Sequence, residues 1–371
     1  YVIPAFRISD EAIDKDVALM ERYGVEVKLG KPAPSVEQLK KMGYTHILMA
    51  TGAWKPGKLD IEGNVQGVIE WMKRMKKQVK PCLSGNIVVV GAGNTAMDAA
   101  RVAKRMGAHA TILYRRTKKF MPADEHELQL AIDEGVEFVE LAAPVKQSRG
   151  KLLCDKMILG EPDESGRRRP VPVPGKFEML PVTCVIGAIG QKVNVAGFEG
   201  VELNKKGIIA ADETSYRTSM EGVFAVGDAT NRGASIAIEA IGEARRCAKV
   251  VDLYLHGVQV PYQKTYLSVR DVSPEDYKDY IKLPRAKMPT RDPEERKHDF
   301  EEINLGFSEA QARAEASRCL DCGCFDFTEC KLIRCANLYE LQPEYIARLR
   351  GNGCGKIHPS FKEKRLVAIE R

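Results

Sequence analysis

The segment Gly91-Ala92-Gly93-Asn94-Thr95-Ala96 has residue types and spacing suited to binding the phosphates of a dinucleotide. It follows residues 86–90, a β-branched run typical of a buried parallel strand, and precedes a helical stretch over 97–106. The first glycine permits a tight turn, and the second lets the backbone approach a pyrophosphate. The helix N-terminus offers N–H groups and a positive dipole end, and Ala96 lies where helix and strand pack closely. A glycine-rich turn that binds nothing is the alternative, but the flanking strand and helix favour the site.

The residues after the second strand of this unit discriminate between two dinucleotides. That strand, residues 110–114, is followed by Arg115 and Arg116, where an NAD site usually carries an acidic residue. A carboxylate would repel a 2′-phosphate, whereas a guanidinium pairs with it. Two solvated charges at a strand end are the alternative. The sequence therefore predicts NADP(H) rather than NAD(H).

A second strand and turn predict a flavin site. The buried strand at 223–227 ends in Gly227-Asp228, and Gly233-Ala234-Ser235-Ile236 then opens a long helix over about 234–256. An aspartate at such a strand end can accept a hydrogen bond from a ribityl hydroxyl, and the helix N-terminus can stabilise negative charge on the reduced ring. Asp228 as the N-cap of that helix is the alternative, and we set it aside because the residue lies too far upstream.

A cysteine-rich stretch near residue 320 predicts a metal centre. In a large chain without a secretory signal, such crowding argues for metal rather than for disulfides, and soft thiolates suit an iron–sulfur cluster or zinc. We expect an iron–sulfur cluster, with zinc and free thiols as the alternatives and Cys335 as a substitute ligand. The expected ligands are Cys319, Cys322, Cys324 and Cys330. Most of the scattered cysteines are expected to be inert apolar residues: Cys82, Cys154, Cys184 and Cys247.

The elements that must position these residues alternate between strand and helix, which predicts an α/β fold. Residues 151–182 are rich in hairpin signals, and residues 260–304 are rich in proline and charge, as in a linker or a wrapping arm. Apolar periodicity predicts the further helices 8–24, 66–78, 124–134 and 306–318, and the further strands 25–28, 45–53, 136–141 and 182–188.

Composition and charge exclude several classes of protein. No apolar run approaches the roughly 20 residues that span a bilayer, and no secretory signal heads the chain. We therefore expect a cytoplasmic protein without membrane insertion. The net charge of +6 is spread out, and its densest run, Arg167-Arg168-Arg169, is interpreted as a solvated turn. No nucleic-acid motif accompanies it, so nucleic-acid binding is not expected.

In their order along the chain these motifs resemble the glutamate synthase small (beta) subunit family, which includes the flavin half of dihydropyrimidine dehydrogenase. The resemblance covers about residues 1–340 and rests on Ala50-Thr51-Gly52, the 91–96 segment, Tyr114-Arg115-Arg116 with Met121-Pro122-Ala123, Ala188-Ile189-Gly190-Gln191, and residues 227–242. It implies a glutathione-reductase-like flavoprotein with two dinucleotide-binding domains, in which the NADPH domain is inserted into the FAD domain.

The resemblance also implies the residues that line each cofactor, position by position. Those for FAD are Thr51, Gly52, Gly190, Gly227, Asp228, Ala234, Ser235 and Ile236. Those for NADPH are Gly91, Gly93, Asn94, Thr95, Ala96, Arg115 and Arg116, with Lys118 as a further candidate.

The expected domains follow the same resemblance. They are a partial FAD-binding domain (1–80), an NADP(H)-binding Rossmann domain (81–188), a return to the FAD-binding domain (189–259), a linker or arm (260–304), and a helix with the cysteine-rich segment and the start of a further domain (305–371). The opening Tyr1-Val2-Ile3-Pro4 resembles the segment after the first FAD fingerprint. We therefore expect an internal piece of a longer polypeptide, without that fingerprint.

The expected reaction is hydride transfer between NADP(H) and FAD, with onward one-electron transfer to iron–sulfur centres of the same or partner chains. The cofactors carry this chemistry, so no catalytic side chain is named. The expected partners are other domains or subunits of an electron-transfer complex. The alternative is a non-catalytic NADP(H)-binding or scaffold module of such a complex. A selenate- or pyrimidine-reducing enzyme would need additional domains.

Overall fold

The computed structural model describes residues 2–78, 80–162, 166–230, 235–257, 273–279 and 281–319. The chain divides into two compact units, and each is described by itself. The larger comprises residues 1–212, 216–244 and 289–306, and the smaller comprises residues 213–215, 245–288 and 307–371.

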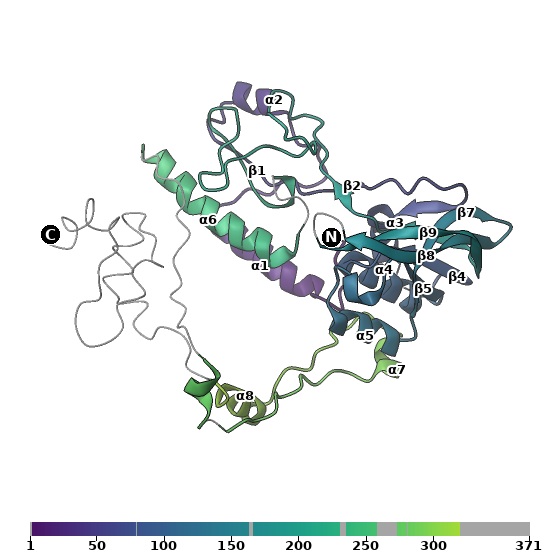
Figure 1. The fold of residues 1–371 in the computed structure, drawn as a ribbon. Coiled ribbons are helices and arrows are strands. Elements are labelled where there is room, and N and C mark those ends of the chain that lie inside the picture. The colour runs from purple at the N-terminus through teal and green to yellow at the C-terminus, as the bar shows by residue number, and fades with distance from the viewer. Residues whose placement is uncertain are drawn as a thin grey trace, which may run out of the picture. The chain divides into compact units, whose positions relative to one another are not determined.

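The larger unit contains a five-stranded parallel sheet in the order β3-β10-β4-β5-β6. Its strands β4 and β5 are labelled in Figure 1. Its strands are Val65–Gly67 (β3), Cys184–Gly187 (β10), Asn86–Val90 (β4), His109–Tyr114 (β5) and Glu137–Glu140 (β6). Helix α4 (Asn94–Arg105) connects β4 to β5. The predicted strand–helix–strand unit is therefore confirmed, and β4 has the predicted bounds.

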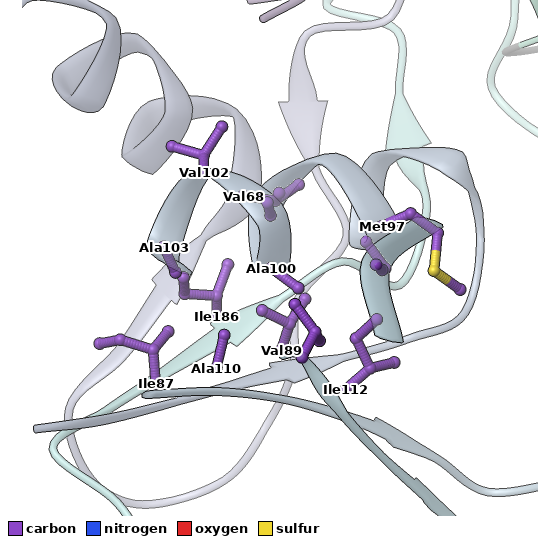
Figure 2. Close-up of a cluster of buried hydrophobic side chains, with 14 of the residues drawn as sticks. Val68, Ile87, Val89, Met97, Ala100, Val102, Ala103, Ala110, Ile112 and Ile186 are labelled. Atoms are coloured by element: carbon purple, nitrogen blue, oxygen red, sulfur yellow. The ribbon is translucent and has the colours of Figure 1, made fainter. Parts of the chain in front are cut away.

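Alternate residues of β4 pack against two different layers, because successive side chains of a strand point to opposite faces. Ile87 and Val89 belong to a cluster that Met97 and Ala100 of α4 share (Figure 2). Helices α3 (Val68–Lys76) and α5 (Glu125–Asp133) contribute to the same cluster. Val88 and Val90 pack in a separate cluster with residues of a second sheet. This double coverage is why the strand is a continuous apolar run.

That second sheet is antiparallel and has the order β7-β8-β9. It comprises Ala142–Ser148 (β7), Lys151–Pro162 (β8) and Arg168–Pro181 (β9), which confirms the hairpins expected over 151–182. Leu152 and Cys154 of β8 are fully buried against β4. Burial raises the pKa of the Cys154 thiol to about 12, and the nearby Glu178 and Asp155 carboxylates act in the same direction.

Alkylation is expected to separate the cysteines by burial. Iodoacetamide at mildly alkaline pH should modify the exposed Cys82 and spare Cys154, because Cys154 is buried and its thiolate is scarce. Peptide mass spectrometry measures both sites, and the denatured chain, in which both should react, is the control. Equal labelling of the two sites in the folded chain would contradict the packing of β8 on β4.

A smaller parallel pair joins segments that are far apart in the sequence. Ile47–Met49 (β1) pairs with Val223–Ala225 (β12), in the register Ile47↔Val223 to Met49↔Ala225. Its own apolar cluster includes Val36, Val201 and Ile209. Two short strands, Lys55–Pro56 (β2) and Gln191–Lys192 (β11), pair antiparallel with each other. Along the chain, β2 lies between β1 and β3, and β11 lies between β10 and β12.

Helix α1 (Asp10–Arg22) confirms the helix expected over residues 8–24, and α2 (Val36–Lys41) follows it. The strand predicted over residues 25–28 was wrong. A strand needs a partner that completes its ladder of hydrogen bonds, and among the described residues no segment pairs with these four. Alternating valines supplied the pattern but could not supply the partner.

The remaining helices confirm two more predictions. Helix α6 (Ala237–Leu255) matches the helix expected over 234–256, and α8 (Glu309–Ala316), with a capping box from Ser308 and Gln311, matches 306–318. The short elements are α7 (Pro293–Arg296) and the 3₁₀ helices η1 (Lys118–Phe120), η2 (Gly227–Ala229) and η3 (Pro274–Tyr277). Among the described residues, no helix combines the length and the apolar character needed to cross a bilayer.

Residues 289–306, which include the last part of the linker or arm expected over 260–304, pack within the larger unit. Ile303 is buried in the α4 cluster, and Arg291 makes two hydrogen bonds with the Asp299 carboxylate. The expected domain boundaries stay predictions. Both β3 and α3, which precede the expected boundary after residue 80, pack with the five-stranded sheet.

Candidate dinucleotide site

A cavity of about 840 Å³ lies at the carboxyl ends of β4, β5 and β10. This is the edge at which open parallel sheets bind their ligands. Nine residues predicted to bind cofactors line it: Gly91, Gly93, Asn94, Thr95, Arg115, Arg116, Gly190, Ser235 and Ile236. Two predicted NADPH residues do not line it. Ala96 is fully buried beneath the turn, and Lys118 is exposed in η1.

Gly91 makes the tight turn at the end of β4. Its φ is +132°, and a Cβ at this position would lie 2.3 Å from the carbonyl oxygen of Ala188. Its own N–H donates to the carbonyl of Leu113 over 3.0 Å. Only glycine fits here, because the backbone after β10 passes too close for a side chain.

Gly93 stands in open space at the start of α4. Its φ of −91° and ψ of 174° are accessible to any residue, and no atom of the described residues lies within 4 Å of the place where a Cβ would be. No side chain among the described residues caps α4. An uncapped helix N-terminus beside the open position of Gly93 fits a pyrophosphate, whose oxygens would accept hydrogen bonds from the N–H groups of the first turn.

The loop after β5 brings guanidinium groups to the same cavity. Arg115 is exposed and Arg116 is half-buried. The Nε of Arg116 donates to the carbonyl of Arg168 over 2.8 Å. Arg167, interpreted from sequence as part of a solvated turn, also lines the cavity. Nothing in the run of arginines indicated this placement, since the contact between hairpin and loop joins residues 52 positions apart.

The predicted flavin residues fall into two groups. Thr51 and Gly52 follow β1, while Gly227 and Asp228 follow β12, so the parallel pairing brings them to one edge. The hydroxyl oxygen of Thr51 is buried and has no hydrogen-bond partner among the described residues, as expected of a group that binds a polar ligand. Gly190, Ser235 and Ile236 instead line the large cavity, and Ala234 lies outside the described residues.

Asp228 does hold the segment that leads into α6. Its carboxylate accepts a hydrogen bond from the backbone N–H of Ser235 over 3.0 Å. Ser235 lies before α6, which begins at Ala237, so this bond is made to the segment ahead of the helix and not within its first turn. Asp228 also lines a cavity of about 200 Å³ with Ala53 and Gln191, and Gln191 lines both cavities.

The predicted metal centre falls almost wholly outside the described residues. Cys322, Cys324 and Cys330 are not among them. Cys319, the last residue of the described range 281–319, is exposed with a free thiol. Within the described ranges, no three His, Cys, Asp or Glu side chains are grouped as metal ligands. The iron–sulfur cluster stays a prediction from spacing.

Three relatives show which proteins this chain resembles. It is 35% identical over 344 residues to the NADP(+)-dependent formate dehydrogenase subunit beta of Moorella thermoacetica, covering 86% of this chain and 48% of the relative. It is 32% identical over 377 residues to the NADPH-Fe(3+) oxidoreductase subunit beta of Geobacter sulfurreducens, covering 86% and 55%. It is 32% identical over 281 residues to the NADPH glutamate synthase small chain of Halomonas elongata, covering 68% and 59%. The chain thus spans about half the length of these relatives.

The last of these matches confirms the resemblance to the glutamate synthase small subunit inferred from the motifs. The model of the Pyridine nucleotide-disulphide oxidoreductase family matches residues 9–244, which is more than half of the chain. That range contains both parallel sheets and the whole lining of the large cavity. The chain therefore belongs to the pyridine nucleotide-disulphide oxidoreductase family, and its α/β fold is that of a flavoprotein disulfide reductase.

Proposed function

We propose that this chain is an NADPH-linked flavin oxidoreductase module that passes electrons on to iron–sulfur centres of the same or partner chains. Family membership implies the cofactors FAD and NAD(P)H. The observation that carries the preference for NADP(H) is the large cavity, where an uncapped helix start and an open Gly93 stand beside arginine side chains. Such a wall suits a pyrophosphate and a 2′-phosphate together.

The residues of this chain bind and orient rather than react. The first turn of α4 would hold the pyrophosphate, and Arg115 would pair with the 2′-phosphate. Thr51 and Asp228, at the edge shared by β1 and β12, would hold the flavin. When bound, FAD supplies the exchange between two-electron hydride chemistry and single electrons. Gln191 lines both cavities, which supports an arrangement in which the two cofactors meet near that residue.

The onward path of the electrons is part of the proposal. Cys319, Cys322, Cys324 and Cys330 would hold an iron–sulfur cluster, an inference that rests on their spacing and thiolate chemistry. Two of the relatives are named as beta subunits. By analogy we propose that this chain works in a cytoplasmic complex of several subunits.

Calorimetric titration of the folded chain with NADPH and with NADH tests the nucleotide preference. We expect NADPH to bind at least about ten-fold more tightly, because only NADPH offers the phosphate that a guanidinium can pair with. A visible flavin spectrum after addition of FAD distinguishes the oxidoreductase from a scaffold that binds only the nucleotide. Absence of heat with NADPH, or equal affinity for both nucleotides, contradicts the proposal.

Alanine in place of Arg115 is expected to weaken NADPH binding by about ten-fold and to leave NADH binding unchanged. Arg115 is exposed, so its loss should not perturb the fold. The same titrations measure the effect, with Lys119→Ala as the control, since Lys119 is exposed in η1 and does not line the cavity. An equal loss of affinity for both nucleotides would assign Arg115 a different role.

A further inference from the structure

We propose that Arg167, at the far end of the β8–β9 hairpin, is a specificity residue that binds the 2′-phosphate of NADP(H) together with Arg115, and that Arg116 is a positioning residue that holds the hairpin there. The inference rests on the proposed function, because it assigns residues to the same cavity. It changes the assignment made from sequence, which gave the phosphate to the two arginines after β5.

The charge of the cavity wall is the first observation. Arg115, Arg116 and Arg167 are the charged residues of the lining among the described parts of the chain, and the lining contains no aspartate or glutamate. Guanidinium groups that gather on one wall of a cavity suit a bound phosphate. A phosphate monoester carries close to two negative charges at neutral pH and accepts several guanidinium hydrogen bonds at once.

The position of these charges is the second observation. Arg115 directly follows β5, which pairs with β4 in the register Val90↔Leu113, one strand away from the Gly91 turn. In a dinucleotide fold, the ribose 2′-position lies at the end of this neighbouring strand when the pyrophosphate sits on the first turn. Arg167 lines the same cavity from the β8–β9 hairpin. The two guanidinium groups can therefore approach one phosphate from two elements.

The hydrogen bonds of the hairpin give the third observation. Arg116 Nε donates to the carbonyl of Arg168, the residue after Arg167, over 2.8 Å. Arg168 Nε in turn donates to the carbonyl of Gly160 on β8 over 2.9 Å. The first bond connects the loop after β5 to the hairpin beside Arg167, and the second lies within the hairpin. Arg116 thus contributes a bond to protein backbone, which is a positioning role.

Titration of the full chain with NADPH, NADH and adenosine 2′,5′-bisphosphate tests the proposal without requiring bound flavin. Alanine at position 167 is expected to weaken the binding of NADPH and of the bisphosphate by about ten-fold and to leave the affinity for NADH unchanged. Arg167→Lys keeps the charge but lacks the planar guanidinium, so its NADPH affinity should fall less, by about three-fold. Arg169→Ala is the matched control, because Arg169 is an exposed arginine of β9 that does not line the cavity.

A double-mutant cycle tests the positioning role of Arg116. If Arg116 acts by placing Arg167, the Arg116→Ala and Arg167→Ala losses in NADPH affinity should not add, and the double variant should resemble the worse single variant. Additive losses would show that Arg116 binds the phosphate itself and would overturn its assignment as a positioning residue. Circular dichroism and thermal melting verify that every variant is folded like the parent.

The outcomes separate this inference from the proposed function. A parent chain that prefers NADPH, together with an Arg167→Ala variant that prefers it equally, overturns the role of Arg167 and leaves the proposed function intact. If Arg167→Ala weakens the binding of NADPH and of NADH equally, the hairpin is a structural support, and the role of Arg167 as a specificity residue is overturned. A parent chain that does not bind NADPH contradicts both proposals.

Discussion

Glutamine in place of Glu134 is expected to lower the free energy of unfolding of the larger unit by about 3–5 kcal/mol, the range for removing one partner of a buried ion pair. Glu134 follows α5, has no exposed surface, and lies among Arg101, Arg105 and Arg296. Arg101 Nη2 donates to its carboxylate over 2.7 Å, and Arg296 Nε donates over 2.9 Å. Without the negative charge, three buried guanidinium groups lose the carboxylate that they share.

The effect is expected to extend to both ends of the unit. Arg101 and Arg105 lie on α4, over the ring of Phe6 at 4.7 and 4.3 Å from its centroid, while Arg296 lies in α7. Phe6 also stacks on Phe300. The carboxylate of Glu134 therefore connects the N-terminal segment and residues 289–306 to the helices of the five-stranded sheet. Limited proteolysis within residues 289–306 should be faster in the variant.

The pH dependence of this contribution follows from the pKa of Glu134. Burial alone would raise that pKa, but hydrogen bonds from Arg101 and Arg105 and their charges outweigh burial and lower it from 4.5 to about 2. A lowered pKa in the folded state means stabilisation that is complete above the unfolded value and is lost as pH falls toward the folded value. The difference in stability between the parent and Glu134→Gln should therefore narrow between pH 4.5 and about pH 2.

Chemical denaturation followed by fluorescence measures the loss. The chain has two tryptophans, so Trp54→Phe leaves Trp71 as the reporter, and Trp71 is buried in the same apolar cluster as Phe6. Glu125→Gln, an exposed glutamate in the first turn of α5, is the control and should cost no more than about 1 kcal/mol. A loss of that small size for Glu134→Gln would contradict a charge network that is shielded from water.

Alanine at Gly91 and at Gly93 is expected to separate folding from binding. At Gly91 the new Cβ would meet the carbonyl of Ala188 at 2.3 Å, at a φ of +132° that side chains rarely adopt. The backbone on both sides is tied, because Gly91 N–H donates to Leu113 and Ala188 N–H donates to Val90. Strain and overlap together are expected to lower the free energy of unfolding by about 2–4 kcal/mol.

At Gly93 the same methyl group meets no atom within 4 Å in the part of the chain that the structure describes, at a backbone conformation open to any residue. The free energy of unfolding should stay within about 0.5 kcal/mol of the parent. The methyl group would nevertheless occupy the space in which a pyrophosphate approaches the backbone. NADPH affinity is therefore expected to fall by at least about ten-fold, with the fold intact.

Denaturation and calorimetry on the two variants give four numbers that decide between these expectations. Gly91→Ala should change stability most, and Gly93→Ala should change affinity with unchanged stability. Parent-like NADPH affinity in Gly93→Ala would show that no ligand approaches this turn. Unchanged stability in Gly91→Ala would show that the Ala188 carbonyl can move away, contrary to its hydrogen-bonded position.

Local pattern was sufficient for the elements that carry the phosphate cradle. The run over 86–90 coincides with β4, and the glycine turn and α4 follow where the spacing places them. These predictions succeeded because each depends on neighbouring residues. A strand covered on both faces is apolar throughout, and a turn at positive φ requires glycine.

Contacts between distant segments were beyond the same reasoning. Residues 25–28 have a strand pattern without a pairing partner among the described residues, and the Asp228 carboxylate accepts a hydrogen bond from the N–H of Ser235, 7 positions along the chain. The burial of Glu134 among three arginines depends on residue 296, which lies 162 positions away. Pairing and burial of this kind depend on the geometry of the whole fold, because the partners are adjacent in space and not in sequence.

The sequence by itself determined the α/β class, the phosphate turn, the arginines after β5 and the family resemblance, because each of these follows from residue type at a short spacing. Only the tertiary structure decided which arginines share a cavity: it brought Arg167 to Arg115 and engaged Arg116 with the hairpin backbone. The physical reason is that a guanidinium acts through its neighbours in space, and the packing of the antiparallel sheet on the parallel one chooses those neighbours.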